Sequence, residues 1–199
     1  MMGVKMTKSY KIEIPLPKRY DFKSVESKWQ RRWEEWGIYR FDKEDKTKPT
    51  FSIDTPPPYP SGEFHVGNAL NHAYIDFAAR YKRLRGYNVL FPQGWDCHGL
   101  PTEVRVEKKL GKTKRDIPRE KFLELARKFT LEWIKPMREA IKRLGCSIDW
   151  ATEYMTMDPD YWRRTQLSFI LMYKKGFIYR AEHPVLWCPR CETAIAEAE

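Results

Sequence analysis

The chain has 199 residues, 42 % of them apolar and 32 % charged, which favours a packed soluble core and argues against intrinsic disorder. Its formal net charge of +10 favours a polyanionic partner such as RNA or a nucleotide, with a merely basic, solvated surface as the alternative. No apolar run approaches the roughly 20 residues of a membrane span. The basic first residues lack the apolar segment of a secretion signal, so we expect a cytoplasmic protein with no membrane partner.

Four cysteines are too few for a disulfide framework in a chain of this length, which favours a reducing compartment. Cys188 and Cys191 form a C-x-x-C pair, a spacing at which two thiolates can hold one zinc ion. A structural zinc site needs four ligands, so only half a site is present. His183 and Cys97 are weaker candidates for completing it, and without a second pair we expect weak or absent metal binding.

The first quarter of the chain predicts an extended arm over residues 1–20 and then an amphipathic helix that ends at Gly37. Ser24 or Ser27 could cap this helix. Its aromatic stripe is more typical of core or a docking surface than of a base-stacking platform. The stripe consists of Phe22, Val25, Trp29, Trp33 and Trp36.

A strand–helix–strand unit follows, with strands from Phe51 and over 87–91 and a helix over 65–85 that Gly86 ends. A unit of this length predicts parallel strands joined by a right-handed crossover. Asp76 and Arg80, four residues apart, read as a modest surface pair. The helix carries apolar residues along one side at the helical period: Val66, Ala69, Leu70, Ala73, Phe77, Ala78, Tyr81 and Leu84.

The second half of the chain predicts mostly helices. A short helix follows Pro101, and a long one runs from near Pro118 to Gly145 with an expected kink at Pro136. A further helix is expected over 161–175, and short strands over 177–179 and 185–187.

The HVGN turn at the start of the 65–85 helix is a candidate phosphate site, because helix N-termini present free N–H groups and a positive dipole. His65, Asn68 and His72 fall at i, i+3 and i+7 on one face at this end. Gly67 removes a side chain where a ligand would approach. His72 is also placed to pack or cap.

A second candidate loop, GWDCHGLP, follows the 87–91 strand. Asp96 in this loop could hold an ammonium group, or it could simply cap the next helix. Ligands of open parallel sheets bind at the carboxyl ends of strands, so both loops are expected to face one crevice.

These stretches resemble class I aminoacyl-tRNA synthetases, in the subgroup that handles valine, isoleucine and leucine. HVGN stands at the family's His-x-Gly-His motif, and GWDCHGLPTE matches its G-W-D-x-H-G-L-P-x-E. HPVLWCPRCETAIAEAE resembles the stretch that enters the inserted editing domain. TPPP and GWDCHGLPTEVRVEK are most like archaeal-type valyl members, whereas isoleucyl members usually carry Gly-Pro-Pro in the proline loop. The resemblance covers the chain from about residue 20 onward.

The resemblance implies an α/β fold: the N-terminal half of a Rossmann-like catalytic domain, a parallel sheet with added helices, truncated before or at the editing insertion. The implied domains are an arm and helix over 1–48, the half-domain over 49–180, and the start of a connective zinc-ribbon segment over 181–199. Four residues are implied to bind ATP with Mg²⁺, of which His65 and Asn68 would be catalytic; the others are Gly67 and His72. Pro56, Pro57 and Asp96 are implied to bind the amino acid, and Cys188 and Cys191 to bind Zn²⁺ in the complete protein.

The implied activity of the parent protein is ATP-dependent ligation of valine to its tRNA. An isoleucyl member remains an alternative, as does a non-catalytic module that binds RNA or another partner. The K-M-S-K-S loop, the editing domain and the anticodon-binding helices are not in the sequence, so we expect the isolated chain not to be fully active.

Overall fold

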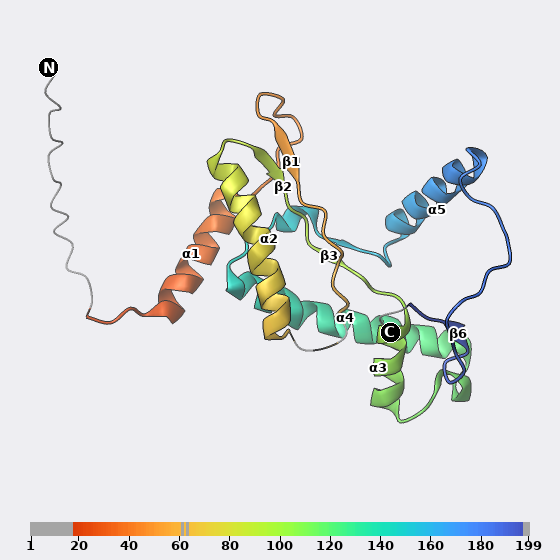
Figure 1. The fold of residues 1–199 in the computed structure, drawn as a ribbon. Helices are drawn as coiled ribbons and strands as arrows, with labels where there is room; N and C mark the ends of the chain where they lie inside the picture. Colours follow the sequence, from red (N-terminus) through yellow and green to blue (C-terminus); the bar gives the residue numbers. More distant parts are fainter. Residues whose placement is uncertain (1–17, 61, 63, 197–199) are drawn as a thin grey trace, which may run out of the picture. The chain divides into compact units, whose positions relative to one another are not determined.

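The computed structural model describes residues 18–60, 62 and 64–196 (Figure 1). Its helices are α1 (Phe22–Trp36), α2 (Val66–Leu84), α3 (Leu100–Leu110), α4 (Arg119–Leu144) and α5 (Pro159–Lys174), with short 3-10 turns at Lys114–Asp116 and Trp150–Thr152. Its strands are β1 (Thr50–Ser52), β2 (Asn88–Leu90), β3 (Gly94–Trp95), β4 (Tyr154–Met155), β5 (Trp187–Cys188) and β6 (Thr193–Ala194). Among these residues, no helix combines the length and apolarity that crossing a bilayer requires. The predicted arm lies almost entirely outside the described residues.

The chain divides into two compact units, each built from several segments. Unit 1 takes the described residues of Met1–Thr55, Gly62–Gln93 and Leu131–Glu153, and so contains α1, α2, β1, β2 and the second half of α4. Unit 2 takes those of Pro56–Ser61, Gly94–Thr130 and Tyr154–Glu199. The predicted boundaries at residues 48 and 180 stay predictions, as does the kink at Pro136.

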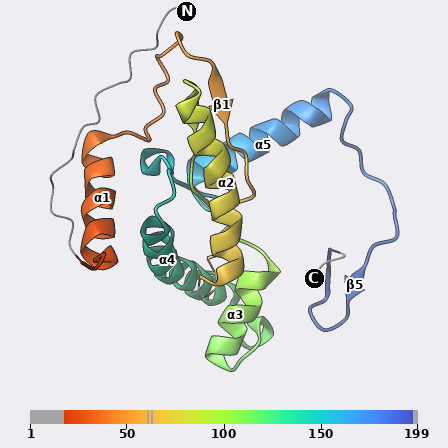
Figure 2. The same ribbon diagram turned by 60° about the vertical axis from the view of Figure 1, so that its left-hand side comes forward.

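Unit 1 contains the predicted strand–helix–strand unit. β1 pairs in parallel with β2, with Phe51 opposite Val89, and the N–H of Ile53 extends the pairing by donating to the carbonyl of Leu90 at 2.8 Å. α2 connects the two strands and lies beside the pair in both views (Figures 1 and 2). The expectation of parallel strands is therefore confirmed. The buried apolar residues of unit 1 are Ala79, Val89, Phe91, Ile134, Met137, Ile141, Cys146 and Ile148.

Most helix ends agree with their sequence signals. Gly37 and Gly111 adopt the left-handed conformation that ends α1 and α3, with φ of 60° and 64°, which a side chain would disfavour. The expected cap of α1 was wrong. Asp21 is its N-cap and accepts from the backbone N–H of Ser24 at 3.4 Å, because a carboxylate one residue before the helix can reach the open N–H groups of the first turn.

The two sides of α2 are the reverse of what its amphipathic pattern normally indicates. Asp76 is only 7 % exposed, so its expected surface pair with Arg80 has one buried member and one half-buried member. Both residues also bond to distant parts of unit 1. The apolar side faces outward in the described residues. Its large side chains are 52 to 88 % exposed: Val66, Leu70, Tyr74, Phe77, Tyr81 and Leu84.

Unit 2 contains a parallel pair, β3 with β4, and an antiparallel hairpin, β5 with β6. The expected strand over 177–179 was wrong, since these residues have no ladder partner in the described structure, and the next strand is β5 rather than 185–187. Buried residues of this unit include Trp95, Cys97, Val106, Phe122 and Phe129.

Candidate functional site

The N-terminus of α2 is organised by the side chain of His65, which is the N-cap residue. Its Nδ1 accepts hydrogen bonds from the backbone N–H groups of Gly67 at 3.1 Å and Asn68 at 3.4 Å. In return, the side-chain oxygen of Asn68 accepts from the backbone N–H of His65 at 3.2 Å. This reciprocal pair is a capping box, with a histidine and an asparagine in the usual positions of Ser or Thr and Glu or Gln.

The capping bonds fix how His65 can meet a ligand. Because Nδ1 accepts two backbone donors, the proton of the neutral ring belongs on Nε2, which becomes a donor. The imidazole is exposed to solvent at the positive end of the α2 dipole. The side-chain oxygen of Asn68 already accepts the capping hydrogen bond, so its amide NH₂ remains as a donor for a ligand. The end of α2 therefore offers hydrogen-bond donors suited to an anion such as a phosphate.

Gly67 and His72 have local roles in this end of the helix. A Cβ at residue 67 would lie 3.0 Å from Cε1 and 3.1 Å from Nδ1 of His65, so glycine allows the imidazole to fold over the first turn. His72 is buried, with Nδ1 2.9 Å from the carbonyl oxygen of Asn68 and its ring edge against Phe64. These contacts favour packing, and direct ATP contact by His72 stays a prediction.

Asp96 lies in unit 2, where the backbone around it is held from two directions. Its N–H donates to the carbonyl of Pro58 in the proline loop at 3.0 Å. On the other side, the N–H of Thr156 donates to the carbonyl of Trp95 at 3.0 Å, and the Thr156 hydroxyl accepts from the N–H of Cys97 at 2.8 Å. The loop is thus clamped between the proline loop and the residue that follows β4.

The carboxylate of Asp96 uses one oxygen for local contacts. Oδ1 accepts from the N–H of His98 at 3.4 Å and lies 3.5 Å from the Thr156 hydroxyl. In the described parts of the chain no donor reaches Oδ2, which could accept from an ammonium group. The capping alternative for Asp96 was wrong, because Gly99 is the N-cap residue of α3 and no side chain caps this helix.

Pro57 packs close to the strand that leads to Asp96. A Cβ at Gly94 would lie closer than 3.0 Å to the ring end of Tyr154 and 2.9 Å from Cβ of Pro57. The Tyr154 ring stacks on Tyr161 with centroids 5.7 Å apart and planes at 3°. Glycine at 94 therefore permits close packing of the proline loop, β3 and β4. This junction lies two residues before Asp96 in the sequence.

Substituting Gly94 with alanine is expected to destabilise this chain by about 1–3 kcal/mol, because the added methyl overpacks a junction whose aromatic wall is stacked in place. Chemical denaturation, monitored by Trp fluorescence, measures the loss. The double variant Gly94→Ala with Tyr154→Ala should recover part of it, giving a non-additive cycle. Additive losses would show that the clash does not control the junction.

The two residues after Asp96 differ in environment. Burial raises the pKa of the Cys97 thiol, which opposes a nucleophilic role. His98 is exposed, and its Nε2 accepts from the indole N–H of Trp162 at 3.3 Å, while Arg127 lies 5.7 Å above the Trp162 ring. The imidazole of His98 therefore bonds to Trp162 of α5, and only the backbone N–H of His98 contacts Asp96.

Cys188 and Cys191 lie on the β5–β6 hairpin, where the N–H of Cys191 points to Sγ of Cys188 at 3.5 Å. This contact lowers the pKa of the Cys188 thiol, and the neighbouring Cys188 sulfur raises the pKa of Cys191. In the residues that the structure covers, no cluster of three or more His, Cys, Asp or Glu side chains is placed to hold a metal. Neither His183 nor Cys97 thus completes the pair, and two ligands do not make a structural zinc site.

The predicted residues fall in two groups. The group predicted to bind ATP, here called the ATP half-site, consists of His65, Gly67 and Asn68 in unit 1, with His72 buried next to it. The group predicted to bind the amino acid, here called the amino-acid half-site, consists of Pro56, Pro57 and Asp96 in unit 2. Sequence reasoning missed Tyr154 and Thr156, which support the second half-site from 58 or more residues away. Both residues lie in or next to β4, which is only two residues long (Tyr154–Met155) and therefore too short for an alternating pattern to predict it.

Comparisons with known proteins identify the family of the chain. A family model described as tRNA synthetases class I (I, L, M and V) matches residues 28–199. Valine–tRNA ligase of Methanothrix thermoacetophila is 60 % identical over 184 residues, covering 92 % of this chain and 21 % of the relative. That of Archaeoglobus fulgidus is 59 % identical over 186 residues, covering 94 % and 21 %.

Among solved structures, an Agrobacterium radiobacter LeuRS in a ternary complex with tRNA and LeuAMS matches with a TM-score of 0.74 and 34 % identity, covering 90 % of this chain and 21 % of that one. The parallel pairs and the helices between them correspond to the fold expected from the sequence. This chain spans about a fifth of the length of the curated relatives it matches (21 %). With the family model matching most of its residues, the chain belongs to the class I tRNA synthetases of the I, L, M and V group.

Proposed function

We propose that the chain is the N-terminal part of a valine–tRNA ligase, which activates valine with ATP and transfers it to tRNA. The identity of 55–60 % to archaeal valine–tRNA ligases over nine tenths of the chain carries the choice of amino acid. The local hydrogen bonds and packing within each half-site favour the view that this segment comes from a catalytic enzyme. The domain limits at residues 48 and 180 form part of this proposal.

In the first step, the valine carboxylate would attack the α-phosphate of ATP and pyrophosphate would leave. His65 would donate from Nε2 to the phosphates and stabilise the charge of the pentacoordinate α-phosphate, with the Asn68 amide as a second donor. Magnesium would share the phosphate charge when bound with ATP. Gly67 would keep the imidazole in place, and His72 would support the first turn of α2 from behind.

Asp96 would hold the α-ammonium of valine through its Oδ2, and Pro56 and Pro57 would form a rigid apolar wall. Fixing the ammonium orients the carboxylate for attack, so this half-site would contribute mainly positioning. The activated valyl group would then pass to the terminal adenosine of tRNA. Zinc at Cys188 and Cys191 would need two further ligands from elsewhere in a longer polypeptide.

The test is valine-dependent exchange of pyrophosphate into ATP by the full-length polypeptide that contains these residues. Exchange with valine favoured over isoleucine is expected. Faster exchange with isoleucine would replace the valyl assignment by the isoleucyl one. Failure to exchange with any amino acid, together with retained tRNA binding, would support a non-catalytic RNA-binding module instead.

A further inference from the structure

The polar face of α2 continues from the ATP half-site into the interior of unit 1. His65, His72 and Asp76 follow at i, i+7 and i+11, which are about two and three turns along a helix, so they share one face. Arg80 and Arg83 extend this face toward the C-terminal end of α2. The residues that would touch ATP and the polar residues that bond to other segments of unit 1 thus lie along one face of the same helix.

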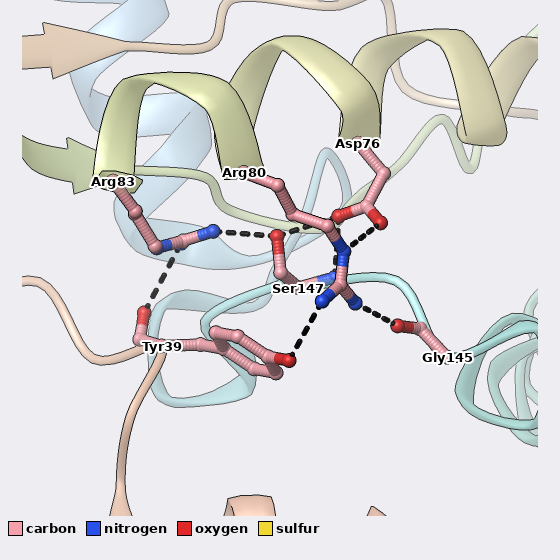
Figure 3. Close-up of polar contacts among 6 residues, drawn as sticks. All are labelled: Tyr39, Asp76, Arg80, Arg83, Gly145 and Ser147. Carbon is pink, nitrogen blue, oxygen red and sulfur yellow. Dashed lines mark hydrogen bonds and ion pairs between the residues drawn. The ribbon is translucent and has the colours of Figure 1, made fainter. Parts of the chain in front are cut away.

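Asp76 joins α2 to the segment after α4 (Figure 3). Its Oδ1 accepts from the N–H of Ser147 at 2.6 Å and from the Ser147 hydroxyl at 2.5 Å. Its Oδ2 accepts from Nε of Arg80 at 2.6 Å. With three charge-assisted bonds from different directions, the carboxylate has little rotational freedom. Burial and the nearby Asp76 charge raise the pKa of the Cys146 thiol to about 12, in keeping with a buried anion there.

The two arginines extend the network to a second segment. Arg80 donates to the carbonyl of Gly145 at 2.6 Å and to the hydroxyl of Tyr39 at 3.1 Å. Arg83 donates to the Ser147 hydroxyl at 2.5 Å and to the Tyr39 carbonyl at 3.4 Å. Figure 3 shows all three α2 side chains pointing toward Ser147 and Tyr39. Three polar side chains of one helix are therefore bonded to residues from two other parts of unit 1.

Directional bonds of this kind fix the rotation of a helix about its axis more sharply than apolar packing, which is non-directional. Six large apolar side chains of α2 lie on the opposite, exposed side, whereas Ala79 is buried and Ile75 half-buried. A side-chain atom about 5–6 Å from the axis moves by about 2 Å when a helix turns by about 20°. Misplacement by about 1 Å can cost about 10²-fold in rate.

We propose that Asp76, held by Arg80 and Ser147, is a positioning residue that sets the rotation of α2 and thereby the direction in which His65 and Asn68 face. This inference rests on the proposed function, because the rotation matters for ATP activation. It assigns a role to a polar network centred on Asp76, about 16 Å along the helix from His65.

The kinetic test uses Asp76→Asn in the full-length polypeptide. We expect kcat for ATP–pyrophosphate exchange to fall about 10- to 100-fold while KM for valine changes less than about twofold, because valine is bound by the other half-site. The matched control is Asp149→Asn. Asp149 is an equally buried carboxylate of unit 1 that accepts from the N–H groups of Phe41 and Ala151. In the described structure it makes no hydrogen bond to α2, and only its charge acts on Arg83.

Equal losses of kcat in the two variants would overturn the proposal, since a general loss of stability would then suffice. If Asp76→Asn does not fold, Ser147→Ala serves in its place, because it removes one bond to Asp76 and one to Arg83 and leaves no buried charge alone. A smaller fall of kcat at constant valine KM is then expected, and an unchanged kcat would contradict the proposal.

A second readout does not depend on activity. Nitroxide labels at the exposed polar positions Asn71 on α2 and Lys28 on α1 report the rotation of α2 within unit 1, with Cys188 and Cys191 replaced by serine. We expect the inter-label distance to shift or broaden in Asp76→Asn and not in Asp149→Asn. An unchanged distance would refute the positioning role, whether or not the wild-type polypeptide exchanges pyrophosphate. Absence of exchange in the wild type, with the distance shift present, would instead refute only the proposed function.

Discussion

Replacing His65 by alanine in the full-length polypeptide is expected to lower kcat of valine-dependent pyrophosphate exchange by about 10²–10³-fold, the range found when one preorganised donor to a developing oxyanion is removed. The reason is that the cap leaves Nε2 as the outward donor of the ring. KM for valine should change little, because Asp96 and Pro57 belong to the other unit. Steady-state exchange kinetics at saturating ATP measure both quantities.

Alanine at 65 also removes the helix cap, which by itself costs about 1 kcal/mol of stability. His65→Asn separates the two roles, because asparagine caps helices well but does not place a donor where Nε2 lies. We expect His65→Asn to keep the thermal stability of wild type and to lose nearly as much activity as His65→Ala. If His65→Asn retains wild-type kcat, the imidazole acts only as a cap and the catalytic role is refuted. His183→Ala, an exposed histidine bonded only to its neighbour's carbonyl, is the matched control and should leave kcat unchanged.

The sequence predicted local structure well because local signals act over a few residues. Glycines at 37 and 111 ended α1 and α3, and β1 and β2 paired in parallel as the length of their connection required. Which residues form the two half-sites stays a prediction; both predicted stretches follow strands and carry recognisable motifs. Among the local elements, the N-cap of α1 and the strands over 177–179 and 185–187 differed, the strands because a strand needs a partner that no local pattern supplies.

Long-range polar contacts were not predictable. Asp76 and Arg80 satisfied the spacing of a surface pair. Nothing in their neighbourhood signals that Ser147, 71 residues away, would donate from both its N–H and its hydroxyl to Oδ1 of Asp76. The same holds for Thr156, which bonds the backbone next to Asp96 from 59 residues away. Such contacts depend on tertiary placement, and hydrogen-bonding side chains reveal their type in a sequence but not their partner.

Amphipathicity identified an apolar side of α2 but could not tell what covers it. In the described residues that side is open, and a contiguous row of large apolar side chains is unusual on the surface of a soluble monomer. We therefore expect the isolated 199-residue chain to self-associate and to bind a hydrophobic dye. The triple variant Leu70→Glu, Phe77→Glu and Tyr81→Glu should be largely monomeric, because each change removes exposed apolar area and adds a charge. Light scattering after size-exclusion chromatography measures the oligomeric state.

The control must add the same charge without removing apolar area. Asn71→Glu, Gln166→Glu and Ser168→Glu do so, since all three are exposed polar positions on helices. If this control disperses the chain equally well, net charge rather than the α2 face governs association.

The same apolar-face variant is expected to be harmful in the full-length polypeptide, which is nearly five times longer in the curated relatives. There it should lower the free energy of unfolding while the control does not, because a row of carboxylates cannot be buried against further chain without partners. Apolar side chains that cause self-association in the isolated chain and stabilise the full-length polypeptide form an interface rather than an ordinary surface. If the apolar-face variant is instead as stable as wild type at full length, α2 keeps this side in water there too.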